Sequence, residues 1–99
     1  MELQIQSIHF DADQKLVDFI EKKLEKLDVF YDRIEGATVY LKLDKDENKE
    51  NKVVEVKLLI PGQDIFVKQK SKTFEAAVDD ILDVLKVQLK KVKEKKISH

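Results

Sequence analysis

The chain has 99 residues, enough for one domain with a single hydrophobic core and too few for a second. Its formal net charge is −1 and it contains no cysteine, so disulfides and thiolate metal sites are excluded. Nothing approaches the run of about eighteen apolar residues that a transmembrane helix needs, and the N-terminus lacks a signal-peptide run. We therefore expect a soluble, cytoplasmic protein without a membrane partner.

The total charge hides a division along the chain. Residues 1–50 hold thirteen acids and eight bases, a net charge of −5, and residues 51–99 hold seven acids and eleven bases, a net charge of +4. A phosphate backbone meets a local patch rather than the total charge. The overall charge therefore does not exclude a nucleic-acid partner.

The first part of the chain predicts a strand followed by a helix. Glu2–Ile8 alternates apolar and polar side chains, the period of a half-buried strand. Asp13 is suited to cap a helix that runs to about Val29, because apolar residues there return at three- and four-residue steps. The acids and lysines of this helix fall on opposite flanks. The acids are Asp18, Glu21, Glu25 and Asp28, and the lysines are Lys15, Lys22, Lys23 and Lys26.

Three further strands follow. Ala37–Asp44 and Val53–Ile60 alternate apolar and polar residues, and the polar run Lys45–Lys52 between them is expected to be an exposed, mobile hairpin loop. Pro61–Asp64 predicts a tight turn, because proline fixes φ and glycine tolerates a positive φ. The last strand should run from Ile65 to about Gln69.

A long helix over Thr73–Lys96 completes the predicted elements. Its apolar residues lie within an arc of about 100° on one face, which must pack on another element. Thr73 or Ser71 is suited to cap it, acids lie toward its positive end, and lysines crowd its negative end. At about 1.5 Å per residue it should overhang a sheet of short strands, with a frayed tip over about residues 90–99.

The element order predicts an α+β fold of the βαβββα type, a single domain over residues 1–99. A four-stranded mixed sheet would have both helices packed on one face, and its first two strands would be parallel through a right-handed crossover. The opposite face would be open and mostly cationic, with two aromatic residues, Tyr40 and Phe66. These aromatics fit either stacking of unpaired bases or an ordinary cross-strand pair.

No set of residues converges on catalysis. An enzyme needs a positioned acid, base, nucleophile or metal. His9 is expected to be a turn residue, and it and His99 lack the spacing of a metal site. Asp79, Asp80 and Asp83 are explained as acids favoured by the helix dipole. We therefore expect no enzymatic activity, cofactor, metal or small-molecule substrate.

The remaining chemistry is cationic. Phosphates attract dispersed lysines on long stems, whatever the nucleic-acid sequence. The lysines of the long helix form two stripes, and those of the first helix add to them, so the surface could engage a folded RNA by its shape. The alternative is a lysine-rich tail that only complements the helix dipole. The first stripe is Lys86, Lys90 and Lys93, and the second is Lys91 and Lys95.

Five short stretches, in order, resemble the short ribosome hibernation-promoting factors and ribosome-associated inhibitor A. They are Lys22–Leu27, Phe30–Ile34, Val39–Lys45, Glu75–Asp79 and Gln88–Lys95. The resemblance covers essentially the whole chain and implies a bacterial factor of stress or stationary phase. Such a factor would bind small-subunit ribosomal RNA in the channel for messenger RNA and the A- and P-site transfer RNAs, and would keep ribosomes inactive.

The resemblance also implies which residues bind RNA. Val84 and Val87 stand where the family often has basic residues, and the adjacent lysines of the first stripe are possible replacements. The matching basic positions are Lys23, Lys26, Lys42, Lys91, Lys93 and Lys95. The first stripe adds Lys86 and Lys90 to these positions, and the lysines of the first helix add Lys22.

Long-form relatives continue into a dimerising domain, so this chain would not dimerise ribosomes by that route. We expect a monomer off the ribosome and no DNA partner. The alternative function is a protein-interaction module that uses the open sheet face or the acidic flank of the first helix, without RNA.

Overall fold

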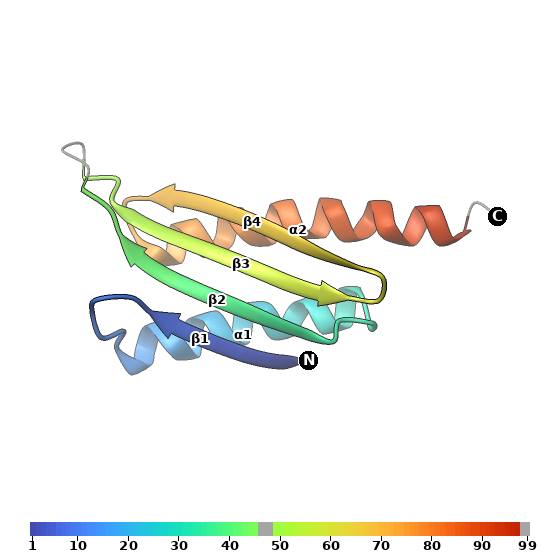
Figure 1. Cartoon of the computed structure of the whole chain (residues 1–99), viewed down its shortest axis with the longest axis horizontal. Helices are drawn as coiled ribbons and strands as arrows, with labels where there is room; N and C mark the ends of the chain where they lie inside the picture. The colour runs from blue at the N-terminus through green and yellow to red at the C-terminus, as the bar shows by residue number, and fades with distance from the viewer. Residues whose placement is uncertain (46–48, 98–99) are drawn as a thin grey trace.

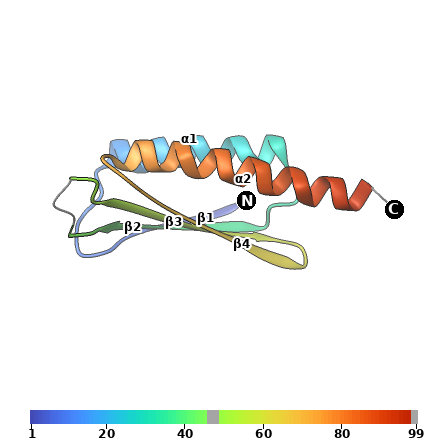
Figure 2. The same cartoon turned by 90° about the horizontal axis from the view of Figure 1, so that it is seen from above.

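The computed structural model describes residues 1–45 and 49–97, which form two layers (Figures 1 and 2). A four-stranded sheet makes one layer, and two helices side by side cover one of its faces. The order βαβββα confirms the predicted α+β fold. The strands are β1 (Glu2–Ser7), β2 (Gly36–Leu43), β3 (Lys52–Ile60) and β4 (Gln63–Ser71), and the helices are α1 (Gln14–Phe30) and α2 (Phe74–Ile97).

The sheet has the strand order β1-β2-β3-β4. β1 pairs with β2 in parallel across the α1 crossover, and β3 and β4 follow as antiparallel neighbours. One row across the open face runs Gln4, Thr38, Lys57 and Phe66. Side chains alternate between faces along each strand, so this register determines which residues share the uncovered face.

The core lies between the sheet and the helices. The helix-facing residues of β2 and β3 are buried, and both helices present apolar stripes to them. Removing this apolar surface from water is the main stabilising term of the fold. Within the described residues, no polar or charged side chain is buried. Fully buried residues include Ile20, Leu24 and Leu27 of α1, Val39 and Leu41 of β2, and Ile81, Leu85 and Leu89 of α2.

Both helices begin at capping residues. The Asp13 side chain accepts a hydrogen bond from the Leu16 backbone N–H at 2.8 Å, which confirms the predicted cap of α1. The Thr73 hydroxyl accepts one from the Ala76 N–H at 3.0 Å, so Thr73 caps α2. Ser71, the other candidate, is the last residue of β4.

The turn between β3 and β4 is shorter than predicted. Pro61 and Gly62 alone form it, with Gly62 at a φ of 84°, and Gln63 already pairs with Ile60. Gln63 and Asp64 therefore belong to β4. The sequence pattern missed them because both are exposed polar residues, which show no apolar alternation.

The other connections agree with the prediction where they are described. His9 lies after β1 at a φ of 65°, as expected for a turn residue. The hairpin between β2 and β3 is closed by a hydrogen bond from the Asp44 N–H to the Asn51 carbonyl at 2.8 Å. Residues 46–48 of the predicted loop lie outside the described residues.

α2 extends beyond the end of the sheet, as predicted (Figures 1 and 2). Over residues 74–95, where the side chains are described, the last fully buried one is Leu89, and Val92 is only partly buried. The helix runs to Ile97, and residues 98–99, part of the tip expected to fray, lie outside the described residues. No helix in the described ranges has the length and apolar character needed to cross a membrane.

Candidate nucleic-acid interface

The two helices lie side by side and run in the same direction (Figure 1). Lys23 and Lys26 on the lysine flank of α1 line a hollow together with residues of α2. This hollow has a volume of about 170 Å³, and we call it the interhelical groove. Three lysines from two elements therefore meet at one place, together with two acids. The groove residues are Lys23, Lys26, Asp79, Leu82, Asp83 and Lys86.

Lys23 is held on both sides. Its ammonium lies 3.1 Å from Asp79 Oδ1 and 5.3 Å from the centre of the Phe19 ring. The side chain of Lys23 is 31% exposed and that of Asp79 is 54% exposed. The ion pair is therefore open to solvent and to any ligand that approaches the groove.

The charge of the α2 flank that faces α1 changes sign along the helix. Steps of three and four residues place its members on one face. Its first half is acidic and lies opposite the lysines of α1, so the charges balance there. Its second half is rich in lysine, although Glu94 follows Lys90 by four residues, so the cationic part of this flank is at the C-terminal end of α2. The members in order are Glu75, Asp79, Asp83, Lys86, Lys90 and Lys93.

Lys93 joins the projecting part of α2 to the end of α1. Its ammonium donates a hydrogen bond to the Phe30 carbonyl at 2.5 Å and lies 4.6 Å from the centre of the Phe30 ring. The last turn of α1 has no basic residue of its own, so Lys93 supplies the positive charge that the helix dipole favours there. Lys93 thus has a structural contact in addition to its predicted contact with RNA.

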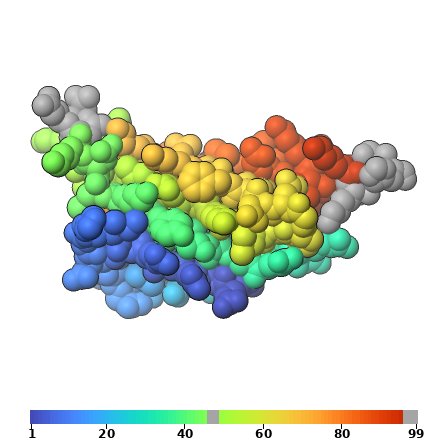
Figure 3. Space-filling view, in the orientation of Figure 1, coloured from blue at the N-terminus to red at the C-terminus, as the bar shows by residue number. Residues whose placement is uncertain are grey.

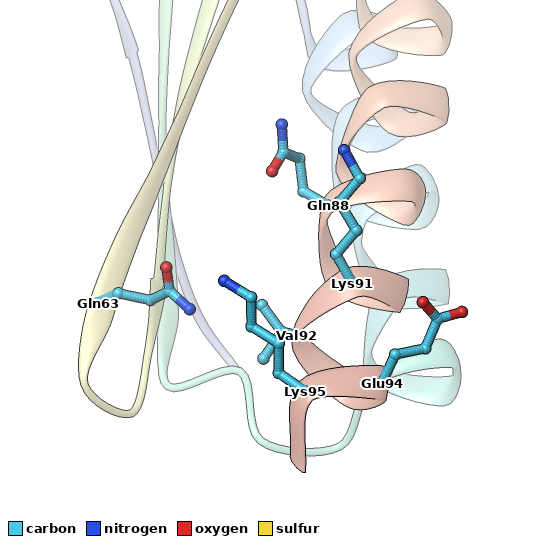
Figure 4. A pocket seen from close by; sticks show the side chains of 6 residues that line it. All are labelled: Gln63, Gln88, Lys91, Val92, Glu94 and Lys95. Carbon is cyan, nitrogen blue, oxygen red and sulfur yellow. The ribbon is translucent and has the colours of Figure 1, made fainter. Parts of the chain in front are cut away.

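Lys91 and Lys95 lie on another flank of α2, beside the β3–β4 turn. They border a hollow of about 370 Å³, which we call the helix-tip hollow (Figure 4). In Figure 4 the Lys95 and Gln63 side chains point toward one another, and Glu94 points away. This second group of lysines lies at the same end of the molecule as Lys93. The lining residues are Gln63, Gln88, Lys91, Val92, Glu94 and Lys95.

The remaining predicted site residues are placed differently. Lys22 is exposed on α1, and Lys90 is exposed on α2, so each adds to the other predicted lysines of its own helix. Lys42 lies on the open sheet face, with its ammonium 2.7 Å from Glu55 Oε2. The fold therefore gathers eight of the nine predicted lysines on the helices and leaves Lys42 across the sheet from them.

The open sheet face is less cationic than predicted. Figure 3 shows this face, which neither helix covers. Three of its lysines have acidic partners, so most of its positive charge is balanced. The pairs are Lys42 with Glu55 at 2.7 Å, Lys57 with Asp64 at 3.6 Å and Lys70 with Asp44 at 3.5 Å.

The two aromatic residues of this face are not neighbours. Tyr40 on β2 pairs with Glu55, whereas Phe66 on β4 pairs with Lys57. β3 lies between them, so the predicted cross-strand aromatic pair is wrong. The two hairpins predicted from the sequence already place β3 between β2 and β4, so they were sufficient to exclude this pair. Phe66 is 58% exposed, which keeps it available to a base.

Sequence reasoning missed the position of Asp79 and Asp83. Both were explained as helix-surface acids, but they line the interhelical groove among the lysines. Their spacing of four residues, followed by three to Lys86, is the signal that places all three on one flank. The sequence pattern does not show that α1 packs beside this flank; the tertiary structure does.

Known proteins resemble this chain over nearly its whole length. The family model described as Sigma 54 modulation protein / S30EA ribosomal protein matches residues 3–97. A ribosome hibernation promoting factor from Pseudomonas putida is 34% identical over 98 residues, covering 99% of this chain and 92% of that protein.

Two solved structures share the fold. A ribosomal subunit interface protein from Coxiella burnetii has a TM-score of 0.84 at 26% identity, covering 95% of this chain and 99% of that one. The N-terminal domain of Protein Y from Thermus thermophilus has a TM-score of 0.78 at 27% identity, covering 93% and 99%. The similarity in structure therefore extends over almost the whole chain.

Proposed function

Because the chain belongs to the Sigma 54 modulation protein / S30EA ribosomal protein family, we propose that it binds the small ribosomal subunit and keeps ribosomes inactive. The names of its relatives, a ribosome hibernation promoting factor and a ribosomal subunit interface protein, support this proposal. The role is one of binding rather than of catalysis. It would be carried out in the bacterial cytoplasm, where ribosomes are, under stress or in stationary phase.

The observation that carries the proposal is the gathering of lysines at one end of the molecule. The C-terminal half of α2 presents them on two flanks of a helix that projects past the sheet. Ribosomal RNA is a dense array of phosphates, and its attraction to lysines grows with the number of charges neutralised. We propose contacts from Lys86, Lys90, Lys91, Lys93 and Lys95 of α2, with Lys22, Lys23 and Lys26 of α1 beside them.

We further propose that the domain occupies the channel that holds messenger RNA and the A- and P-site transfer RNAs. A projecting cationic helix suits a site lined by RNA on several sides. Such a site also gives Lys42 a role, because RNA on the far side of the channel would meet the open sheet face. Lys42 would then exchange Glu55 for a phosphate.

Co-sedimentation with purified small subunits at graded potassium tests the interface. The charge reversals Lys86→Glu with Lys90→Glu, and Lys91→Glu with Lys95→Glu, should each weaken binding at least about tenfold. Lys93 is left unchanged because it also contacts Phe30. Lys72→Glu, the same change at an exposed residue between β4 and the start of α2, is the control and should leave binding within about threefold. Wild-type binding by both double variants would refute this interface.

Competition tests the channel separately. Small subunits loaded with messenger RNA and a P-site transfer RNA should bind the protein much more weakly than empty subunits. If loaded and empty subunits bind it equally, the protein occupies another site on the ribosome. Ribosome binding would then stand, and the channel proposal would fall.

A further inference from the structure

Two acids line the interhelical groove together with three lysines and Leu82. Asp79 and Asp83 share the interhelical groove with Lys23, Lys26 and Lys86. Asp79 is paired with Lys23 at 3.1 Å. A surface built only to attract phosphates would not place carboxylates among its ammonium groups, since each one offsets a positive charge.

The helix dipole does not account for these acids. The dipole favours acids within the first turn of a helix, and Glu75 occupies that turn of α2. Asp79 and Asp83 lie in the second and third turns, where the effect has fallen away.

Stability does not account for the ion pair either. Asp79 is 54% exposed and Lys23 is 31% exposed, and ion pairs so open to solvent contribute little to folding.

We propose that Asp79 and Asp83 are specificity-determining residues, which act as internal competitors of phosphate. Asp79 takes a place beside Lys23 that an RNA phosphate would otherwise take, and Asp83 adds a second negative charge to the groove that Lys26 lines. An arbitrary RNA must displace them, so it gains little from Lys23 and Lys26. An RNA surface shaped to meet the lysines of α2 beyond the interhelical groove does not have to displace these two acids. This inference rests on the proposed function, because it concerns how the same surface distinguishes ribosomal RNA from other RNA.

Charge-neutralising variants test this role. Asp79→Asn and Asp83→Asn are titrated by fluorescence anisotropy with a labelled uridine oligonucleotide about thirty nucleotides long, at several salt concentrations. One lysine released to one phosphate steepens the salt slope by about 0.7, which is about a fivefold gain in affinity near 0.1 M salt. Asp80→Asn is the matched control. It makes the same change at the next residue of α2, which is exposed outside the groove, and should gain less than about twofold.

Two further measurements test whether the acids affect specificity and whether Asp79 acts through Lys23. The same substitutions should raise the affinity for purified small subunits less than the affinity for the oligonucleotide. The ratio of subunit affinity to oligonucleotide affinity should therefore fall at least about threefold. In a Lys23→Gln background, Asp79→Asn should give no more gain than Asp80→Asn. Thermal unfolding of each variant should stay close to wild type, which separates the effect from a change in folding.

Three results would overturn the inference. The first is that Asp79→Asn and Asp80→Asn raise the affinity for the oligonucleotide equally. The second is that Asp79→Asn raises this affinity as much in the Lys23→Gln background as in the wild type. The third is that Asp79→Asn and Asp83→Asn raise the affinities for subunits and for the oligonucleotide equally. Failure of the wild-type protein to bind subunits would instead refute the proposed function. The oligonucleotide titrations need no ribosome and would still show whether the acids screen the lysines.

Discussion

The lysines of this protein differ in how available they are to a ligand, because their neighbouring side chains differ. Lys93 is directed at the Phe30 carbonyl and ring, whereas Lys90, one turn earlier on the same flank, is exposed. Lys23 is matched with an acid, and Lys42 is matched with another across the sheet. A lysine-rich sequence therefore overstates the number of ammonium groups that a ligand meets without competition.

Replacing Lys93 should loosen the link between the helices. Lys93→Met keeps the alkyl stem but loses a charged hydrogen bond and a cation–π contact, a cost of about 1–2 kcal/mol. Thermal unfolding followed by circular dichroism should show a midpoint lower by about 4–16 °C. Lys90→Met serves as the control and should change stability by less than about 0.5 kcal/mol. Equal stability of the two variants would show that the Phe30 contact is unimportant.

At the scale of the element, α2 is divided into a packed part and a projecting part. From Phe74 to Leu89 its apolar stripe is buried against the sheet and α1, and over residues 90–95 Val92 is the apolar side chain that packs partly against the core. The packed part holds the helix, because a projecting segment this short is marginal in water by itself. The lysines of the tip therefore depend on burial one or two turns earlier.

Shortening the last fully buried side chain should affect the tip most. Leu89→Ala should cost about 2–5 kcal/mol of folding free energy, because it opens a cavity under the C-terminal half of α2. Urea unfolding measures this loss, and amide exchange should quicken over residues 90–95. Val87→Ala is the matched control, since Val87 is 55% exposed and should change stability by less than about 0.5 kcal/mol. A similar cost for both variants would contradict the assigned division of α2.

At the scale of the whole molecule, charge is distributed unevenly although the total is only −1. The acids of α1 lie on the flank away from its lysines, and the lysines of α2 gather toward its C-terminal end. Such a charge distribution orients the protein as it approaches a polyanion. Net charge is therefore a poor guide to the partner of this protein.

Binding to the small subunit should weaken steeply with salt. If the five lysines at the end of α2 each neutralise one phosphate, log Kd should rise with log of the potassium concentration at a slope of about 4. Affinity would then fall more than about a hundredfold between 50 and 200 mM potassium, at fixed magnesium. Co-sedimentation over that range measures the slope. A slope below about 1 would indicate a mainly uncharged interface and favour a protein partner.

Most of the fold could be predicted because its determinants are local. Alternation over β2 and β3 and the three- and four-residue steps of α1 and α2 reflect backbone geometry, which each segment carries by itself. Strand ends were less predictable. Gln63 and Asp64 extend β4 without any apolar side chain, so only their pairing with β3 reveals them.

The sequence alone determines which segments form helices and strands and which of their faces are apolar. It also determines the resemblance to a family and the number of lysines in α2. Only the packed structure decides which charges meet: Lys23 with Asp79, Lys93 with Phe30, and Lys42 with Glu55. The physical reason is distance along the chain. Periodicity specifies which face of an element a side chain occupies, whereas its neighbours on other elements depend on helix orientation and strand register.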